Sequence, residues 1–250
     1  MVTATFRFHE ELNDFLSRER RERAFATDCA RAATTKHMIE ALGVPHTEVG
    51  RLLVNGEAGS FARLLEEGDT VAAHPQHADT TSPRRFVADA HLGALARLLR
   101  MAGFDTLYDN GYRDEEIVAI ANREGRTVLT RDRELLKRRE VEHGCYLHAI
   151  APQAQLRELS ARLALAPLAR PFTRCLHCNL PLRPVAKAEV LERLPESVRL
   201  THDEFTTCDA CARVFWKGSH HTRMLAMLGG AIGPGIGLKS SLTSSASDHA

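Results

Sequence analysis

Residues 85–140 decide the fold, and they read RFVADAHLGALARLLRMAGFDTLYD (85–109) and, after a short turn, DEEIVAIANREGRTVLTRDRELLKRRE (114–140). Strand and helix patterns alternate here in the order 85–90 (strand), 92–103 (helix), 105–109 (strand), 114–125 (helix), 126–132 (strand) and 133–140 (helix). Strands that alternate with helices along a chain predict a parallel sheet with helices on its faces. We therefore expect an α/β domain, which we place at residues 84–165.

The first 77 residues follow a different pattern. Residues 3–8 alternate as a strand, residues 23–27 provide a hairpin partner, and residues 35–42 read as a short helix. An Asn55-Gly56 turn and a Gly68-Asp69 turn then accompany two further strands. This ββαββ order resembles the ubiquitin-like β-grasp fold, particularly its sulfur-carrier branch.

Sulfur carriers act through a free C-terminal Gly-Gly, whereas this segment continues through His74-Pro75-Gln76-His77 into more protein. The resemblance therefore implies a docking or structural role for residues 1–77, with a protein partner, in place of carrier chemistry. Residues 78–83, ADTTSP, are polar and end in proline, which predicts a linker.

Two Cys-x-x-Cys pairs lie in the last third of the chain, at Cys175, Cys178, Cys208 and Cys211. Each spacing lets two thiolates share one tetrahedral ion with Zn–S bonds of ~2.3 Å. The 29 residues between the pairs are enough for the arms of a zinc ribbon, which we place at residues 170–228. Four thiolates complete the coordination shell, so we expect this zinc to be structural. Cys29 and Cys145 stand alone, and we expect them to be buried core residues.

Aromatic and basic residues follow the last cysteine pair. Trp216 could stack on an unpaired base, and Lys217 and Arg223 could contact phosphates, which predicts RNA binding. The alternative is that the aromatic residues form the core of a small zinc domain. After Gly229 the chain is rich in Gly and Ser, and we expect a disordered tail over residues 229–250.

Charge and hydropathy limit the interpretation. The 33 basic and 32 acidic residues nearly cancel, so any site for a polyanion must be local. The six cysteines are mostly in metal-type pairs, which is typical of a reducing compartment. No signal peptide or membrane span is evident in the sequence, so we expect a cytoplasmic protein without a membrane partner.

Three aspartates carry the candidate chemistry. Asp89 and Asp132 each end an apolar strand, and Asp114 begins the helix between them, so all three should face the carboxyl edge of one parallel sheet. Clustered carboxylates suit hard divalent cations, and Mg²⁺ or Mn²⁺ bound there could support hydrolysis of a nucleic-acid phosphodiester. Taken singly, Asp114 and Asp132 could instead be helix N-caps.

Three segments together resemble a known family: residues 86–109, residues 114–139, and the two cysteine pairs with CLHCNLPL and CDACARVFWKGSHHTRM. They look like the Mut-seven C-terminal RNase family, a branch of the PIN-like nucleases whose bacterial members often carry an N-terminal ubiquitin-like domain. By this resemblance Asp89, Asp114 and Asp132 correspond to the family's acids. A fourth acid is common in PIN-like sites, and among Asp109, Glu115 and Glu134 we choose Glu115.

The resulting hypothesis is a metal-dependent ribonuclease with a β-grasp module, a PIN-like domain and a zinc ribbon. Arg131 and Arg133 flank Asp132 and could bind phosphate oxygens of a single-stranded or structured RNA, or they could be solvated surface residues; of the two we choose Arg131 as the RNA-binding residue. A first alternative is a non-catalytic RNA-binding or adaptor protein that uses the ribbon and the β-grasp module. A second alternative is a sulfur-transfer partner. The sequence does not determine the oligomeric state.

Overall fold

The computed structural model describes residues 1–77 and 81–233, and it divides into two compact units. The first unit comprises Met1–His91 and Asp109–His148, and the second comprises Leu92–Tyr108 and Ala149–Ala250. The α/β segment that we placed at residues 84–165 is therefore shared between the two units.

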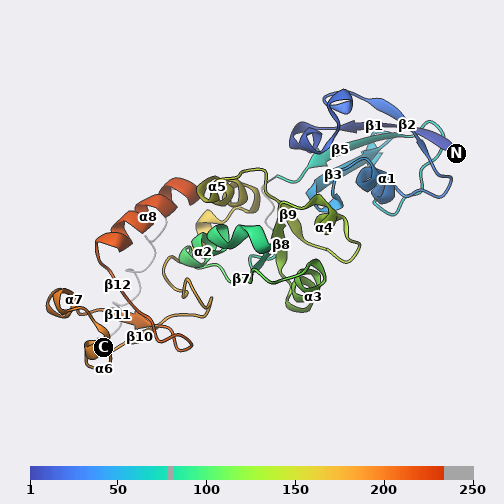
Figure 1. Ribbon diagram of the computed structural model, residues 1–250. Helices are drawn as coiled ribbons and strands as arrows, with labels where there is room; N and C mark the ends of the chain where they lie inside the picture. The colour runs from blue at the N-terminus through green and yellow to red at the C-terminus, as the bar shows by residue number, and fades with distance from the viewer. Residues whose placement is uncertain (78–80, 234–250) are drawn as a thin grey trace, which may run out of the picture. The chain divides into compact units, whose positions relative to one another are not determined.

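The N-terminal module of the first unit, residues 1–77, has the ubiquitin-like β-grasp fold (Figure 1). Its sheet has the order β2-β1-β5-β3-β4, with β1 antiparallel to β2 and parallel to β5. The elements are β1 (Val2–Phe8), η1 (Glu10–Phe15), η2 (Arg18–Arg20), β2 (Phe25–Cys29), α1 (Thr35–Ala41), η3 (His46–Glu48), β3 (Val49–Val54), β4 (Glu57–Ala58) and β5 (Thr70–Pro75). The predicted ββαββ order is confirmed, with β4 as a short additional strand after the Asn55-Gly56 turn.

Local sequence explains the turn between β3 and β4 and the start of α1 in this module. Asn55 and Gly56 have φ values of 56° and 85°, the positive values that a two-residue hairpin turn between β3 and β4 requires. The side chain of Thr34 accepts a hydrogen bond from the N–H of His37 and caps α1. Phe6 and Ile39 are fully buried at the centre of the module's core.

Three parallel strands form the rest of the sheet structure in the first unit. They are β6 (Phe86–Ala88), β8 (Thr127–Thr130) and β9 (Gly144–Tyr146), and β8 pairs with both neighbours. Every residue of β6 and β8 is buried, as expected for parallel strands covered on both faces. Helices α3 (Asp114–Glu124) and α4 (Arg133–Lys137) flank β8 in the sequence. The predicted parallel α/β pattern is confirmed, and Cys145 is buried in β9 as we expected.

The second unit is built from helices and a small sheet. Helix α5 (Pro152–Leu163) packs against α2 (Gly93–Met101) and α8 (Ser219–Ile232). Strand β7 (Thr106–Tyr108) follows α2, and a 3₁₀ turn η5 (Ala166–Leu168) follows α5. The predicted tail begins too early, because α8 continues through residues 229–232. Residues 234–250 of that predicted tail, and residues 78–80 of the predicted linker, lie outside the described residues.

The ribbon sheet also belongs to the second unit. Its order is β10-β11-β12 and both pairings are antiparallel. The ribbon comprises β10 (Arg183–Val185), α6 (Lys187–Val190), η6 (Leu191–Arg193), α7 (Glu196–Thr201), β11 (Phe205–Thr207) and β12 (Val214–Trp216). Its buried core consists of Val190, Leu194, Val198 and Phe205. Across both units, none of the described helices has the length and apolarity needed to span a bilayer.

We predict that Gly103→Ala destabilises the protein strongly. Gly103 ends the turn after α2 with φ of 94°, and a Cβ added there would lie 2.1 Å from the carbonyl oxygen of Arg170. The combined backbone strain and clash should lower the free energy of unfolding by at least ~1–3 kcal/mol, measured by urea unfolding.

Gly230→Ala is the matched control, because a Cβ at that position in α8 meets nothing within 4 Å. It should leave the unfolding midpoint unchanged or raise it, since alanine favours the helix. Equal stability of the two variants would contradict the assigned backbone conformation of Gly103.

Candidate active site and metal centre

Asp89 and Asp132 lie at the carboxyl ends of two adjacent parallel strands. Asp89 follows β6 and Asp132 lies two residues after the end of β8, and the two strands pair directly. Thr130, the last residue of β8, joins them. Its hydroxyl donates to Oδ2 of Asp89 at 2.6 Å and accepts from the backbone N–H of Asp132 at 2.9 Å. One buried hydroxyl therefore connects both candidate acids.

The sequence analysis missed this role of Thr130. Its side chain is fully buried, so the hydroxyl needs partners inside the protein. A polar β-branched residue at the end of a buried strand and directly before a candidate acid motif was the available indication. The carboxylate of Asp89 is held further by the N–H of Ala90, which donates to Oδ1 at 2.6 Å.

The helix-cap alternative holds for one aspartate and fails for another. Asp132 is the N-cap of α4, and its Oδ1 accepts from the N–H of Glu134 at 2.8 Å. Asp114 lies inside α3, whose N-cap is Arg113. There Glu116 accepts from the N–H of Arg113 at 2.9 Å. The carboxylate of Asp114 is thus not used as the cap of its helix.

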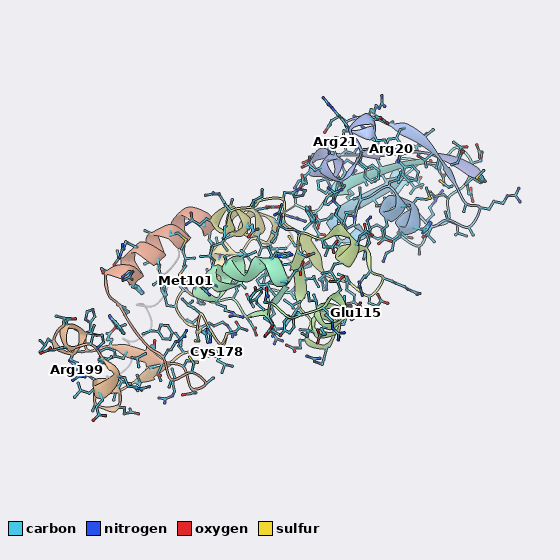
Figure 2. The ribbon with its side chains drawn as sticks, viewed as in Figure 1. Arg20, Arg21, Met101, Glu115, Cys178 and Arg199 are labelled. Carbon is cyan, nitrogen blue, oxygen red and sulfur yellow. The ribbon has the colours of Figure 1, made fainter. Side chains whose placement is uncertain are left out.

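Asp114 and Glu115 both bind the guanidinium of Arg138, just past the end of α4. The Nη2 atom of Arg138 lies 3.2 Å from Oδ2 of Asp114 and 3.0 Å from Oε1 of Glu115, which Figure 2 labels on α3. The pKa of Glu115 is lowered, first by a hydrogen bond from its own backbone N–H and then by Arg138. Sequence reasoning did not single out Arg138.

The structure therefore separates the predicted acids into two pairs. Asp89 and Asp132 share Thr130, whereas Asp114 and Glu115 share Arg138. Within residues 1–77 and 81–233, two groups of candidate metal ligands have all their ligand atoms within 4.8 Å of one another. They are the four cysteines and an exposed Glu10, Glu11 and His77 group, so the three aspartates do not form such a group.

The remaining candidates near this edge have local partners. Asp109 accepts from the N–H of Gly111 at 2.8 Å within a turn, and Glu134 binds Lys137 at 2.8 Å. Arg131 is exposed beside Asp132, and its Nε donates to the carbonyl of Leu147 at 3.2 Å.

Cys175, Cys178, Cys208 and Cys211 converge as predicted. Their sulfur atoms all lie within 4.8 Å of one another, and the sulfurs of Cys175 and Cys211 are 3.7 Å apart. A tetrahedral ion with Zn–S bonds of ~2.3 Å has sulfur–sulfur edges of ~3.8 Å, so the cluster fits a metal such as zinc. A hydrogen bond from the backbone of Arg213 lowers the pKa of Cys211 to about 7, whereas burial raises the pKa of Cys175 and raises the pKa of Cys178 to about 12. The convergence of the four sulfurs, and not their pKa values, is therefore what indicates a metal site.

A pocket opens on the ribbon face of the second unit. Its volume is about 440 Å³, and its lining includes Phe172, Phe215, Trp216, Lys217 and His221. The ring of His221 lies 4.2 Å from the ring of Phe172, and burial lowers the pKa of His221. The pocket therefore presents aromatic faces beside a cationic side chain.

The three predicted RNA-binding residues of this unit differ in their settings. Trp216 packs partly against the ribbon core, as the alternative of a small zinc-domain core predicts, and it also lines the pocket. Lys217 lines the pocket and forms an exposed ion pair with Glu204 at 2.8 Å. Arg223 is exposed on α8, where its guanidinium lies 3.2 Å from Nδ1 of His220.

Two family models match this sequence. The Mut7-C RNAse domain covers residues 84–228, and the Mut7-C ubiquitin model covers residues 1–81. The chain belongs to the Mut7-C RNAse domain family. This membership supports a nuclease-type function and implies an RNA substrate, and the ubiquitin-like module suggests protein interactions.

Solved structures similar to part of this Mut7-C chain are ubiquitin-like proteins from Haloferax volcanii. One crystal structure of small archaeal modifier protein 1 is 19% identical, covers 30% of this chain and 98% of its own, and has a TM-score of 0.25. A second, of SAMP1, is 20% identical, covers 29% of this chain and 93% of its own, and has a TM-score of 0.25. Among curated proteins, none matches the sequence.

Arg100 supports the metal centre of this Mut7-C chain from α2. Its Nη1 donates to the carbonyls of Leu176 at 3.2 Å and His177 at 2.9 Å, the two residues inside the first cysteine pair. Its Nε donates to the carbonyl of Thr106 at 2.9 Å. Burial lowers the pKa of Arg100, and the nearby Cys175 and Cys178 oppose that shift. A buried cation thus lies near Cys175 and Cys178, whose sulfurs carry negative charge when they bind metal.

Asn179 provides a second connection between the first cysteine pair and the turn after α2. Its Oδ1 accepts from the N–H of Thr106 at 2.9 Å, and its Nδ2 donates to Asp105 at 2.7 Å. Asn179 has φ of 64°, a conformation that asparagine adopts more readily than most residues. Neither Arg100 nor Asn179 was identified from the sequence.

We predict that Arg100→Met weakens zinc binding by about ten- to a hundredfold, because the carbonyls of Leu176 and His177 lose their donor and the thiolates lose a cation. Competition with a chromophoric chelator measures the affinity. Arg97→Ala, which removes an exposed arginine from the same helix, should leave zinc affinity unchanged. Equal affinities for Arg100→Met and the wild type would refute the supporting role.

Proposed function

We propose that this protein is a divalent-metal-dependent ribonuclease whose acidic site is centred on Asp89 and Asp132. The observation that carries the proposal is the Thr130 hydroxyl, which links the two carboxylate-bearing residues at the ends of β6 and β8. The carboxyl edge of a parallel sheet is the usual ligand site in such folds. Membership of the Mut7-C RNAse domain family supports the same activity.

Asp89 and Asp132 would hold the cation, because carboxylate oxygens are the ligands that Mg²⁺ and Mn²⁺ prefer. Bound there, the cation would supply charge neutralisation at the phosphate and a more acidic water. The protein's own contribution is orientation. Asp89 accepts from both Thr130 and Ala90, so its carboxylate is fixed before any ligand binds.

Asp114 and Glu115 have a different role in this proposal. Both are held by Arg138, which balances their charge and keeps two further carboxylates in place on α3. Either can act as an additional acid if Arg138 moves toward a phosphate, since a guanidinium can exchange one oxyanion partner for another. Arg131, exposed beside Asp132, would bind a phosphate oxygen of the RNA.

We propose further that the ribbon pocket binds unpaired bases of the RNA. Trp216, Phe215 and Phe172 offer aromatic faces, and stacking on such faces is the common way to bind single-stranded nucleic acid. Lys217 at the pocket and Arg223 on α8 would meet the phosphates.

A non-catalytic RNA-binding adaptor is the second candidate, and one observation favours it. Asp132 caps α4, Asp114 and Glu115 are paired with Arg138, and Asp89 accepts from Thr130 and Ala90, so all four acids have partners without any metal. The adaptor would bind RNA through the ribbon and a protein through the ubiquitin-like module. It predicts RNA retention without cleavage.

Asp89→Asn and Asp132→Asn are predicted to lower metal-dependent cleavage of labelled single-stranded RNA on the order of a hundredfold or more, because each removes a negatively charged ligand. Folding should survive, since Asn remains a good N-cap at residue 132 and keeps an acceptor oxygen at residue 89. The assay compares EDTA, Mg²⁺ and Mn²⁺ at matched ionic strength.

Asp28→Asn is the control for these variants, because it changes an exposed aspartate of the ubiquitin-like module in the same way. It should cleave at the wild-type rate. Retained RNA with no cleavage by the wild type in any of the three conditions would favour the adaptor.

Lys217→Ala should weaken RNA binding and reduce the dependence of affinity on salt concentration by about one phosphate contact. Fluorescence anisotropy across a salt series, with Asp89→Asn as the background to prevent cleavage, measures both quantities. Lys187→Ala is the matched control. Lys187 also pairs with a ribbon acid, Asp203, at 2.8 Å, but it does not line the pocket. Identical salt dependence for the two variants would exclude Lys217 from the binding surface.

A further inference from the structure

Arg133 follows Asp132 directly, yet its side chain is committed to the ubiquitin-like module. Its Nη1 donates to the carbonyl of Phe15 at 3.1 Å, and its Nη2 lies 3.4 Å from the carbonyl of Asp14. The guanidinium also lies over the rings of Phe15 at 5.1 Å and Tyr146 at 5.9 Å. The planar guanidinium donates hydrogen bonds from its edge and stacks on aromatic rings with its face. Arginine differs from lysine in this combination of contacts.

An aromatic cluster surrounds this arginine. Phe15 meets Tyr146 edge to face at 5.0 Å between ring centroids, and His148 lies 5.4 Å from Phe15 and 4.8 Å from Tyr146. Phe15 is the last residue of η1 and is almost fully buried, whereas Tyr146 ends β9. Tyr146 also packs against the core of the ubiquitin-like module. The cluster thus joins this core to the strand beside β8.

The module also covers the outer edge of β9. Glu48 is 1% exposed, and its Oε1 accepts from the N–H of Tyr146 at 2.8 Å. A ring nitrogen of His46 lies 3.0 Å from the carbonyl of Val141, just before β9. A Cβ on Gly144 would meet Leu136 at 2.5 Å and Thr47 at 3.2 Å, so the two parts approach closely there. These contacts satisfy polar groups that an edge strand otherwise leaves open.

A short series of neighbouring residues and hydrogen bonds connects these contacts to the candidate acids. Arg133 is the first residue of α4, and its neighbour Asp132 caps that helix and donates its N–H to Thr130. The hydroxyl of Thr130 then donates to Asp89. On the other side of β8, the N–H of Leu147 donates to the carbonyl of Thr130 at 3.0 Å. The ubiquitin-like module therefore holds the segments on both sides of Thr130.

We propose that the ubiquitin-like module is a fixed part of the nuclease site and that Arg133 is the positioning residue through which the module orients Asp132. The inference rests on the proposed function for its effect on cleavage, but not for its effect on local structure. Arg133 does not bind phosphate in this proposal, because both of its Nη atoms face the carbonyls of Phe15 and Asp14. The module's surface at Phe15 is thus covered by Arg133 and Tyr146 of the same chain.

The test compares Arg133→Ala, Arg133→Lys and Phe15→Leu with the wild type in the full-length protein. Amide hydrogen exchange of residues 128–137 should be faster in Arg133→Ala and Phe15→Leu. The turnover number for RNA should fall by about ten- to a hundredfold with KM unchanged, as expected for a displaced catalytic group. Arg133→Lys should be intermediate, because it keeps the charge and loses the planar fork.

Arg139→Ala is the matched control, an exposed arginine just beyond α4 that should change neither quantity. Wild-type exchange and turnover in Arg133→Ala would overturn the proposal. A higher KM at unchanged turnover would also overturn the proposal, because that result indicates phosphate binding. A lower melting temperature with unchanged exchange and turnover of the folded protein would overturn it as well. If the wild type cleaves no RNA, the proposed function fails, and the exchange experiment alone decides the positioning role.

Discussion

Parallel pairing of β6 with β8 brings the carboxyl ends of two fully buried strands to one edge of a sheet, and the candidate acids are arranged around that edge. The strands end at Ala88 and Thr130, and a carboxylate follows each of them within two residues, Asp89 after β6 and Asp132 after β8. The buried hydroxyl of Thr130 has one neighbour that accepts and one that donates, Asp89 and the N–H of Asp132. A side chain with both hydrogen-bonding capacities is needed at this position, and threonine also suits a strand.

The metal centre depends on a different constraint, the small size of the ribbon core. A core of a few apolar residues offsets little of the entropy of ordering the ribbon, and a metal held by the four cysteines would add to its stability. Arg100 and Asn179 attach the first cysteine pair to α2 and the turn that follows it. The tight approach at Gly103 belongs to the same attachment. A metal held by the four cysteines would thus organise a ribbon that is already tied to a helical support.

The contacts of the ubiquitin-like module indicate a role that differs from that of the carriers it resembles. As a sequence it resembles a carrier, whose function depends on a free end. In the structure, its surface around Phe15 and Glu48 contacts β9 and α4, and these contacts use a buried carboxylate and a stacked guanidinium. Such groups are costly to leave unpaired, so the contact surface is unsuited to repeated release.

Sequence alone determined the element types and the four cysteines that come together as a candidate metal site. The Asn55-Gly56 turn, the alternation around β6 and β8, and the two Cys-x-x-Cys pairs are local patterns whose physics acts within a few residues. Membership of the family and the presence of three aspartates were likewise visible in short motifs. The start of the tail was misplaced because two glycines weaken a helix without ending it at residues 229 and 230.

Only the tertiary structure decided which acids are neighbours and which arginines are available. Asp132 proved to be a cap that also lies beside Asp89, whereas Asp114 lies with Glu115 on Arg138. Arg131 and Arg133 look equivalent in the sequence, yet one remains exposed and the other binds Phe15. The cap made by Asp132 is local, but the contacts of Arg131, Arg133 and Arg138 join partners 16 to 118 residues apart. Side-chain direction and distant packing set them, and no local pattern encodes either.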